Sequence, residues 1–187
     1  MLKIFKFDNE NVLSDIEVFE RNSNIVLPKE YREFLLKYNG GHTPKTTFKI
    51  NGISSNIRGF YGLGRADNFY NLKYPYLSEK LDYFIQNFYF PIATDSFGND
   101  LLINYGDFYG NIYFYDHENQ TYTLLANSFT DFIKSITSKK FVSRSIDERL
   151  EGLRQSGSNI VVDDALISLW QEEINKYQGR KQEVVSI

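Results

Sequence analysis

Apolar residues recur every three or four positions in several stretches of the first 138 residues, and this spacing predicts amphipathic helices. Ser128 stands near the start of the last of these stretches, and serine is a residue type that caps helix starts. The stretches that show this spacing are residues 14–21, 27–41, 77–88 and 127–136.

The stretch 27–41, LPKEYREFLLKYNGG, is the best defined of these helices. Tyr31, Phe34 and Tyr38 lie on one of its faces. We expect Gly40 and Gly41 to supply the positive backbone angle that closes the helix. No residue on the apolar face points to catalysis, so this helix is predicted to be structural.

Short β-prone runs separated by turn residues fill residues 90–127. Gly98 and Asn99 mark one turn, and the segment 106–111, GDFYGN, marks another. Short strands joined by such closely spaced turns predict an antiparallel meander. With helices before and after these strands, we predict an α+β fold in which helices cover an antiparallel sheet.

The character of the chain changes after residue 138. We therefore expect an α+β domain over residues 1–138 and a helical C-terminal extension over residues 139–187. In the extension, Ser145 and Glu148 form a capping-box pattern before a charged helix. The final residues, GRKQEVVSI, are expected to fray.

The last predicted helix, residues 162–178, carries Trp170 on a narrow apolar stripe. This stripe has three interpretations. It docks on the α+β domain, it pairs with a second copy in a homodimer, or it contacts a partner protein.

The composition excludes several classes of site. There is no cysteine, so disulfides, thiolate chemistry and cysteine-based metal sites are excluded. Charged residues within the first ten positions argue against a secretory signal peptide. No stretch approaches the roughly 20 apolar residues of a membrane span. These features predict a cytoplasmic protein without a membrane segment.

The charge of the chain is unevenly distributed. Residues 61–118 hold three basic and eight acidic residues, a net charge of −5, whereas the rest holds 18 basic and 16 acidic residues, or +2. The same central stretch contains more than half of the aromatic residues. An acidic centre argues against nucleic-acid binding and suits a basic protein partner. The alternative is that these acids are ordinary solvated turn residues.

Candidate catalytic residues are few. His42 lies in a predicted loop, and His117 points away from its acidic neighbours if the segment is a strand. The segment 62–67, GLGRAD, lacks both the third glycine of a dinucleotide loop and the ending of a phosphate loop. Asp95 and Asp100 flank one turn, so a carboxylate pair stays open as an enzyme hypothesis.

Six motifs in a fixed order resemble the SUKH superfamily, whose name-giving member is a fungal regulator of cell-wall assembly. The motifs are the acidic helix near residue 14, LPKEYREFLLKYNGG, FYGLG, PIATDSFGNDLLIN, GNIYFYDHE and NSFTDFI. The resemblance covers about residues 12 to 138. Phe60 and Tyr61 stand where the family often has a tryptophan.

The resemblance implies an α+β fold that binds proteins, with no catalytic residues, no metal and no cofactor. Many bacterial members are immunity proteins, so we expect this chain to bind and neutralise a cognate toxin domain. The alternative is an intracellular scaffold with an endogenous partner, and an unrecognised hydrolase is a third hypothesis. We expect the partner-binding residues to be exposed acids and aromatics of the strand turns, namely Asp95, Asp100, Asp107, Phe108, Tyr109, Asp116 and Glu118.

Overall fold

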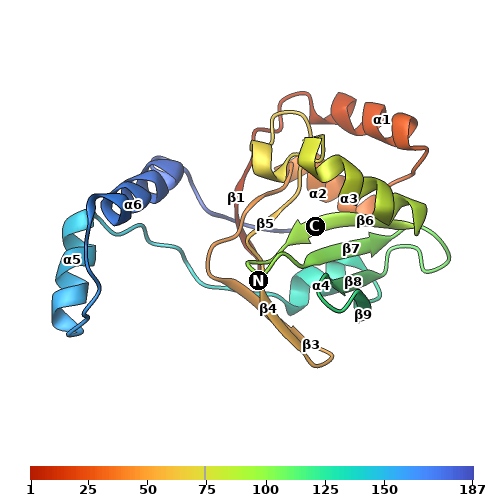
Figure 1. Cartoon of the computed structure of the whole chain (residues 1–187). Coiled ribbons are helices and arrows are strands. Elements are labelled where there is room, and N and C mark those ends of the chain that lie inside the picture. The colour runs from red at the N-terminus through yellow and green to blue at the C-terminus, as the bar shows by residue number, and fades with distance from the viewer. Residues whose placement is uncertain (74) are drawn as a thin grey trace. The chain divides into compact units, whose positions relative to one another are not determined.

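The computed structural model describes residues 1–73 and 75–187, except for the side chains of residues 75–79. The described backbone divides into two compact units, which are coloured along the chain in Figure 1. The sheet unit comprises Met1–Lys139 and Gln182–Ile187, and the helical unit comprises Lys140–Lys181.

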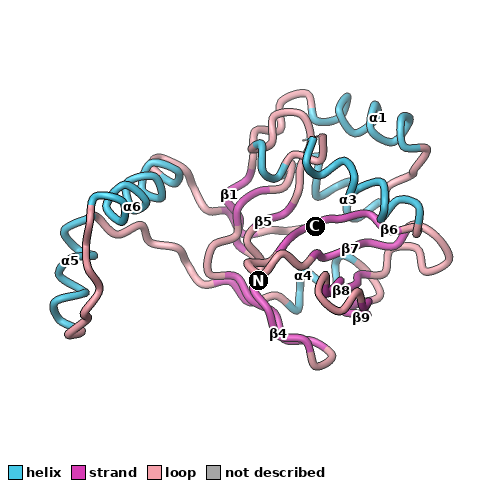
Figure 2. The backbone as a smooth tube through the Cα atoms, in the orientation of Figure 1, coloured by secondary structure: helices cyan, strands magenta, loops and turns pink. Residues whose placement is uncertain are grey.

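Antiparallel strands form the framework of the sheet unit (Figure 2). In the described part of the chain the strands are β1 (Lys3–Lys6), β2 (Gly41–His42), β3 (Thr46–Ile50), β4 (Ile53–Asn56), β5 (Gly59–Phe60), β6 (Tyr89–Thr94), β7 (Asp100–Asn104), β8 (Ile112–Asp116), β9 (Thr121–Ala126), β10 (Thr137–Ser138) and β11 (Glu183–Val184). They make an eight-stranded sheet in the order β11-β1-β2-β5-β6-β7-β8-β9 and a three-stranded sheet in the order β10-β3-β4. Neighbouring strands β6 to β9 follow chain order, which confirms the predicted meander and the α+β fold.

In the described residues of the sheet unit the structure has four α-helices. They are α1 (Val12–Ser23), α2 (Lys29–Tyr38), α3 (Pro75–Gln86) and α4 (Phe129–Ser135), with a short 3₁₀ helix at Asn68–Tyr70. Ser128 caps α4 as expected, because its hydroxyl accepts a hydrogen bond from the Asp131 backbone N–H at 3.1 Å.

The end of α2 differs from the expectation. Asn39, with φ at 50°, is the left-handed residue that closes the helix, and its side chain accepts from the Leu63 N–H at 2.9 Å. The glycines serve a different purpose, which is close approach of the backbone. A Cβ on Gly41 would lie 2.4 Å from the Phe5 carbonyl oxygen, so only glycine lets β2 pair with β1 there.

The two faces of the sheet bury different side chains. Along β7, Leu101 and Ile103 join the main hydrophobic core, whereas Leu102 lies on the opposite face in a second cluster with Phe84 of α3. The main core also takes residues from α1, α2 and α4, among them Ile16, Phe34 and Phe132. The ring of Phe34 packs against Phe60 and Phe129, each at 5.2 Å between ring centroids.

The C-terminal segment is ordered in the sheet, so the expected fraying is wrong. Strand β11 pairs antiparallel with β1, and the Val185 N–H donates to the Leu2 carbonyl at 2.9 Å. Val185 itself is buried. On the other flank of the helical unit, Ser138 accepts a hydrogen bond from the Lys3 N–H at 3.1 Å. The chain therefore leaves and re-enters the sheet unit beside the same strand, β1.

The helical unit contains α5 (Ile146–Gln155) and α6 (Asp164–Tyr177). Ser145 and Glu148 form the predicted capping box at the start of α5. Arg149 joins the two helices, because it pairs with Glu173 at 2.7 Å and lies over the Trp170 ring at 5.7 Å. Neither helix has a buried residue. Among the helices of the described residues, none combines the length and apolar character needed to cross a lipid bilayer.

Candidate protein-binding surface

The meander places the seven predicted partner-binding residues at two opposite ends. The β6–β7 and β8–β9 turns lie at one end, because Asp100 pairs in register with both Thr94 and Tyr115. The β7–β8 turn lies at the other end, next to the Ile103–Ile112 pair. A strand of five residues separates the ends by roughly 16 Å. Asp95, Asp100, Asp116 and Glu118 therefore do not form one patch with Asp107, Phe108 and Tyr109.

Asp95 is buried, with only 2% of its surface exposed, so the expectation of an exposed acid is wrong here. Its carboxylate accepts hydrogen bonds from the backbone N–H groups of Phe97 and Asn99 at 2.8 and 2.9 Å. It also accepts from the Asn99 amide at 2.9 Å and from the Ser55 hydroxyl at 2.7 Å. Asp95 thus holds the β6–β7 turn and ties it to β4.

Asp100 is fully buried, and the expectation of exposure is wrong for it as well. Its carboxylate pairs with Lys80 of α3 at 2.5 Å and accepts a hydrogen bond from the Tyr61 hydroxyl at 3.3 Å. Burial raises the pKa of Asp100, and this effect outweighs the lowering by Lys80. Asp100 therefore fastens α3 to the sheet and is not available to a partner.

Asp116 and Glu118 lie in the β8–β9 turn. The half-exposed Asp116 accepts from the backbone N–H groups of Glu118 and Asn119, and its bonds to Asn119 lower its pKa. Glu118 is exposed. The neighbouring His117 is fixed by its Nδ1, 2.8 Å from the Asn99 side-chain oxygen.

Asp107, Phe108 and Tyr109 form the tip of the β7–β8 hairpin, and all three are exposed. The turn beneath them is held by Asn104, whose side-chain oxygen accepts from the N–H groups of Gly106 and Phe108 at 3.0 and 3.1 Å. The two aromatic rings are therefore presented on a defined backbone.

Two further apolar residues lie beside this tip. The Tyr109 hydroxyl donates to the Val26 carbonyl at 3.4 Å, and the Phe88 carbonyl accepts from the Tyr105 N–H at 3.0 Å. Val26 and Phe88 are strongly exposed. We call Val26, Phe88, Asp107, Phe108 and Tyr109 together the hairpin patch.

Phe88 holds an uncommon backbone conformation, with φ at 62°. A bulky residue rarely adopts this left-handed angle, and such strain is concentrated at functional sites. The spacing of apolar residues placed Phe88 on the buried face of the helix predicted over residues 77–88, but α3 ends at Gln86 and Phe88 is exposed. Val26 lies in a connection between two helices, where no periodic pattern marks a residue.

The position of His42 differs from the expectation, because this residue is buried in a strand rather than lying in a loop. His42 lies in β2, its Nε2 is 2.5 Å from an Asp67 carboxylate oxygen, and it packs edge-on against the rings of Phe7 and Tyr70. Within residues 1–73 and 75–187, the described side chains contain no group of three or more potential metal ligands.

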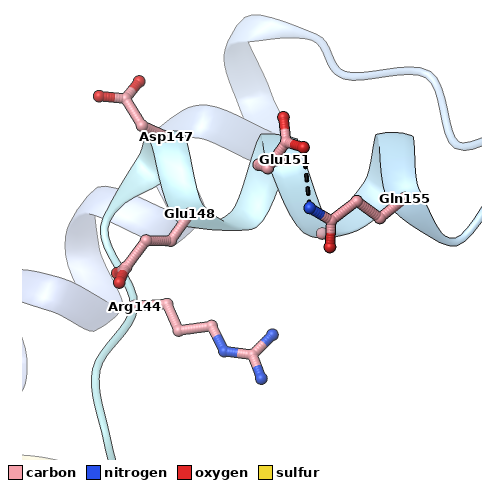
Figure 3. Close-up of a pocket in the computed structure, with 6 residues that line it drawn as sticks. Arg144, Asp147, Glu148, Glu151 and Gln155 are labelled. Atoms are coloured by element: carbon pink, nitrogen blue, oxygen red, sulfur yellow. Dashed lines mark hydrogen bonds between the residues drawn. The ribbon is translucent and has the colours of Figure 1, made fainter.

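A pocket in the helical unit is lined by α5 and the residue Arg144 before it (Figure 3). Glu148 belongs to the capping box, and Glu151 accepts a hydrogen bond from the Gln155 amide at 2.9 Å. Both acids are exposed, and their hydrogen bonds are made within α5 and its N-cap, Ser145. The pocket therefore differs from typical ligand sites, which are mostly apolar and hold a few polar groups directed at the ligand. The homodimer predicted through the C-terminal helices stays a prediction.

Comparison with known proteins places this fold in a family. The family profile described as SMI1 / KNR4 family (SUKH-1) matches residues 13–135. The SPbeta prophage-derived uncharacterized protein YokK of Bacillus subtilis (strain 168) is 27% identical over 188 residues, covering 87% of this chain and 90% of that protein. No solved structure matches. Because the profile spans more than half of the sequence, the chain belongs to the SMI1/KNR4 family (SUKH-1).

Proposed function

We propose that this protein is an immunity protein, which binds a cognate toxin domain in the cytoplasm and neutralises it by protein–protein contact. Membership of the SUKH-1 family supports the proposal, because the resemblance implies protein binding, most often to a toxin. The single structural observation that carries it is the hairpin patch, in which exposed aromatic rings gather at one end of the sheet.

The hairpin patch has the chemistry of an interface anchor. Phe108 and Tyr109 offer large ring surfaces at little cost in conformational entropy, because Asn104 already holds their backbone. Aromatic residues are enriched at interface hot spots. Asp107 adds a negative charge at the tip, which steers a basic partner toward the two rings.

The test compares two aromatic residues of similar exposure at opposite ends of the meander. Phe108 is 61% exposed in the β7–β8 turn, and Phe97 is 67% exposed in the β6–β7 turn. The chain is co-expressed with the toxin encoded beside its own gene, and growth rescue and the Kd of the purified pair are measured. We expect Phe108→Ser to weaken binding about 30-fold, which corresponds to about 2 kcal/mol, and Phe97→Ser to change it less than threefold.

Two results would contradict the proposal. Failure of the wild-type protein to rescue growth, together with a stable complex with a housekeeping protein, would favour the scaffold alternative. Equal effects of Phe108→Ser and Phe97→Ser on a confirmed complex would remove the hairpin patch from the interface.

A further inference from the structure

Five tyrosines gather on the outer face of the meander, which is the face that carries Leu102. Their rings form a connected series. Tyr89 stacks on Tyr122 at 4.8 Å and meets Tyr113 at 5.3 Å, while Tyr115 lies 4.9 Å from Tyr122 and 6.4 Å from Tyr83 of α3. We call these five residues the tyrosine face.

The tyrosine face is only partly covered by the fold. Phe84 of α3 packs on Tyr115 at 5.1 Å, and these two side chains are buried with Leu102. Tyr89, Tyr113 and Tyr122 stay half-buried, and Tyr83 is exposed. An ordinary outer sheet face carries small polar or charged residues, so this concentration of rings is not required for solubility.

The phenol groups remain hydrogen-bonding groups at neutral pH. Burial raises the pKa of Tyr89 and of Tyr122, and neighbouring phenols add to the rise. The hydroxyls of Tyr89 and Tyr122 therefore keep their protons. The face combines apolar ring surfaces with neutral donors and acceptors, the combination that protein-binding surfaces use.

The charges near the tyrosine face favour a cation. Asp100 pairs in register with Tyr115, and Asp116 is the next residue of β8. Burial raises the pKa of Tyr115, and the two carboxylates add to the rise. Lys80, the cation that the described residues place against this face, is already paired with Asp100. Asp116 follows Tyr115 directly in β8 and is half-exposed.

We propose that the tyrosine face is a second contact surface for the toxin partner and receives an arginine-bearing loop of that protein. This inference rests on the proposed function. A guanidinium group is planar and weakly hydrated, so it stacks on open tyrosine rings while its N–H groups donate to phenol or carboxylate oxygens. Lysine lacks the planar group, and a nucleic acid would be repelled by Asp116. A second copy would bring the same acid against itself.

The first test uses a probe that does not depend on the toxin. The full chain, with ¹³C-labelled tyrosine rings, is titrated by NMR with a blocked Gly-Arg-Gly peptide. The control is the same peptide with citrulline, which keeps the shape and removes the charge. We expect the ring signals of Tyr113 and Tyr122 to shift at least five times more with the arginine peptide. Tyr109 of the hairpin patch and the buried Tyr31 should not move.

Variants then separate binding from folding. Tyr113→Thr with Tyr122→Thr keeps residues suited to strands, and Tyr83→Ala changes only an exposed helix position. The remaining reporters are then Tyr89 and Tyr115, which contact the replaced rings in the wild type. We expect these two rings to shift with the arginine peptide in the wild type but not in the double variant, and the double variant to bind the toxin of the growth assay at least tenfold more weakly. Should the double variant fail to fold, Tyr83→Ala must still reduce the shifts at least twofold.

Four outcomes would overturn the inference. They are no shift at all, equal shifts with both peptides, shifts confined to Tyr109, and concentration-dependent broadening of the tyrosine face without peptide, which would indicate a second copy as its occupant. Growth rescue that fails while the arginine shifts persist would instead contradict the proposed function alone.

Discussion

Replacing Asp95 by alanine tests whether this acid supports the fold. The variant deprives four donors of their acceptor, namely two backbone N–H groups, the Ser55 hydroxyl and the Asn99 amide. Each such bond contributes about 1 kcal/mol net, and more where the lost acceptor is charged. Because Phe97 is exposed, water replaces part of the loss. We expect Asp95→Ala to lower the free energy of unfolding by about 3 kcal/mol.

Asp116→Ala is the matched control. Asp116 accepts from two backbone N–H groups and from the Asn119 amide, in a turn of similar geometry. It is half-exposed and its donors lie in an exposed turn, so water takes over these bonds. We expect this variant to cost about 1 kcal/mol or less.

The assay must report on the sheet unit. The single tryptophan, Trp170, lies in the helical unit, so its fluorescence would follow the wrong transition. Urea unfolding is therefore followed by near-ultraviolet circular dichroism of the buried tyrosines. Equal costs for Asp95→Ala and Asp116→Ala would refute the reasoning, because burial would then not decide the value of the acceptor.

Three further predictions concern the sheet unit. Burial raises the folded-state pKa of Asp100, so the stability that Asp100 contributes is fully present below its unfolded value of 3.8 and is lost as the pH rises through the folded-state pKa. The free energy of unfolding of the wild type relative to Asp100→Asn should therefore fall as the pH rises above 3.8, which urea titrations at a series of pH values measure. Replacing residues 140–181 by a short Gly-Ser linker should leave the near-ultraviolet circular dichroism and the unfolding midpoint of the sheet unit nearly unchanged. The reason is that Ser138 and Val184, on the two flanks of that segment, both lie beside Lys3. Loss of folding would contradict this prediction. Gly41→Ala should lower the free energy of unfolding by about 3 kcal/mol or more, and Gly52→Ala by about 1 kcal/mol. Both glycines have positive φ, but only at Gly41 would the added Cβ meet backbone atoms. Equal unfolding midpoints for the two variants would contradict this prediction.

Local signals explain which elements the sequence predicts. The strands of the meander are short β-prone runs bounded by turn residues, and α2, α4, α5 and α6 carry caps or apolar stripes. The strands β1, β2 and β11 were missed because two to four residues carry no usable period, and the pairing of β1 with β2 and β11 joins residues more than 30 positions apart. Long-range pairing of this kind leaves no local pattern.

The seven predicted partner-binding residues do not form one patch, and the predicted meander was already enough to show this. Successive hairpins of an antiparallel meander alternate between its two ends, so Asp95 and Asp107 were never able to share a patch. The burial of Asp95 was not readable in the same way. An aspartate in a turn has the same local pattern whether its carboxylate meets water or, as here, Ser55 from the other sheet.

The two ends of the meander use their polar residues differently. At the β6–β7 end, the carboxylate of Asp95 accepts hydrogen bonds within the turn and that of Asp100 forms an ion pair with α3. Both carboxylates are buried, so replacing either is expected to lower the free energy of unfolding. At the β7–β8 end the turn is held instead by the neutral Asn104, which leaves Asp107, Phe108 and Tyr109 without a structural duty in the hairpin itself. Side chains that the fold does not need are the ones that can change to suit a partner. Partner specificity is therefore expected to reside in the hairpin patch and in the tyrosine face that extends from it along the sheet.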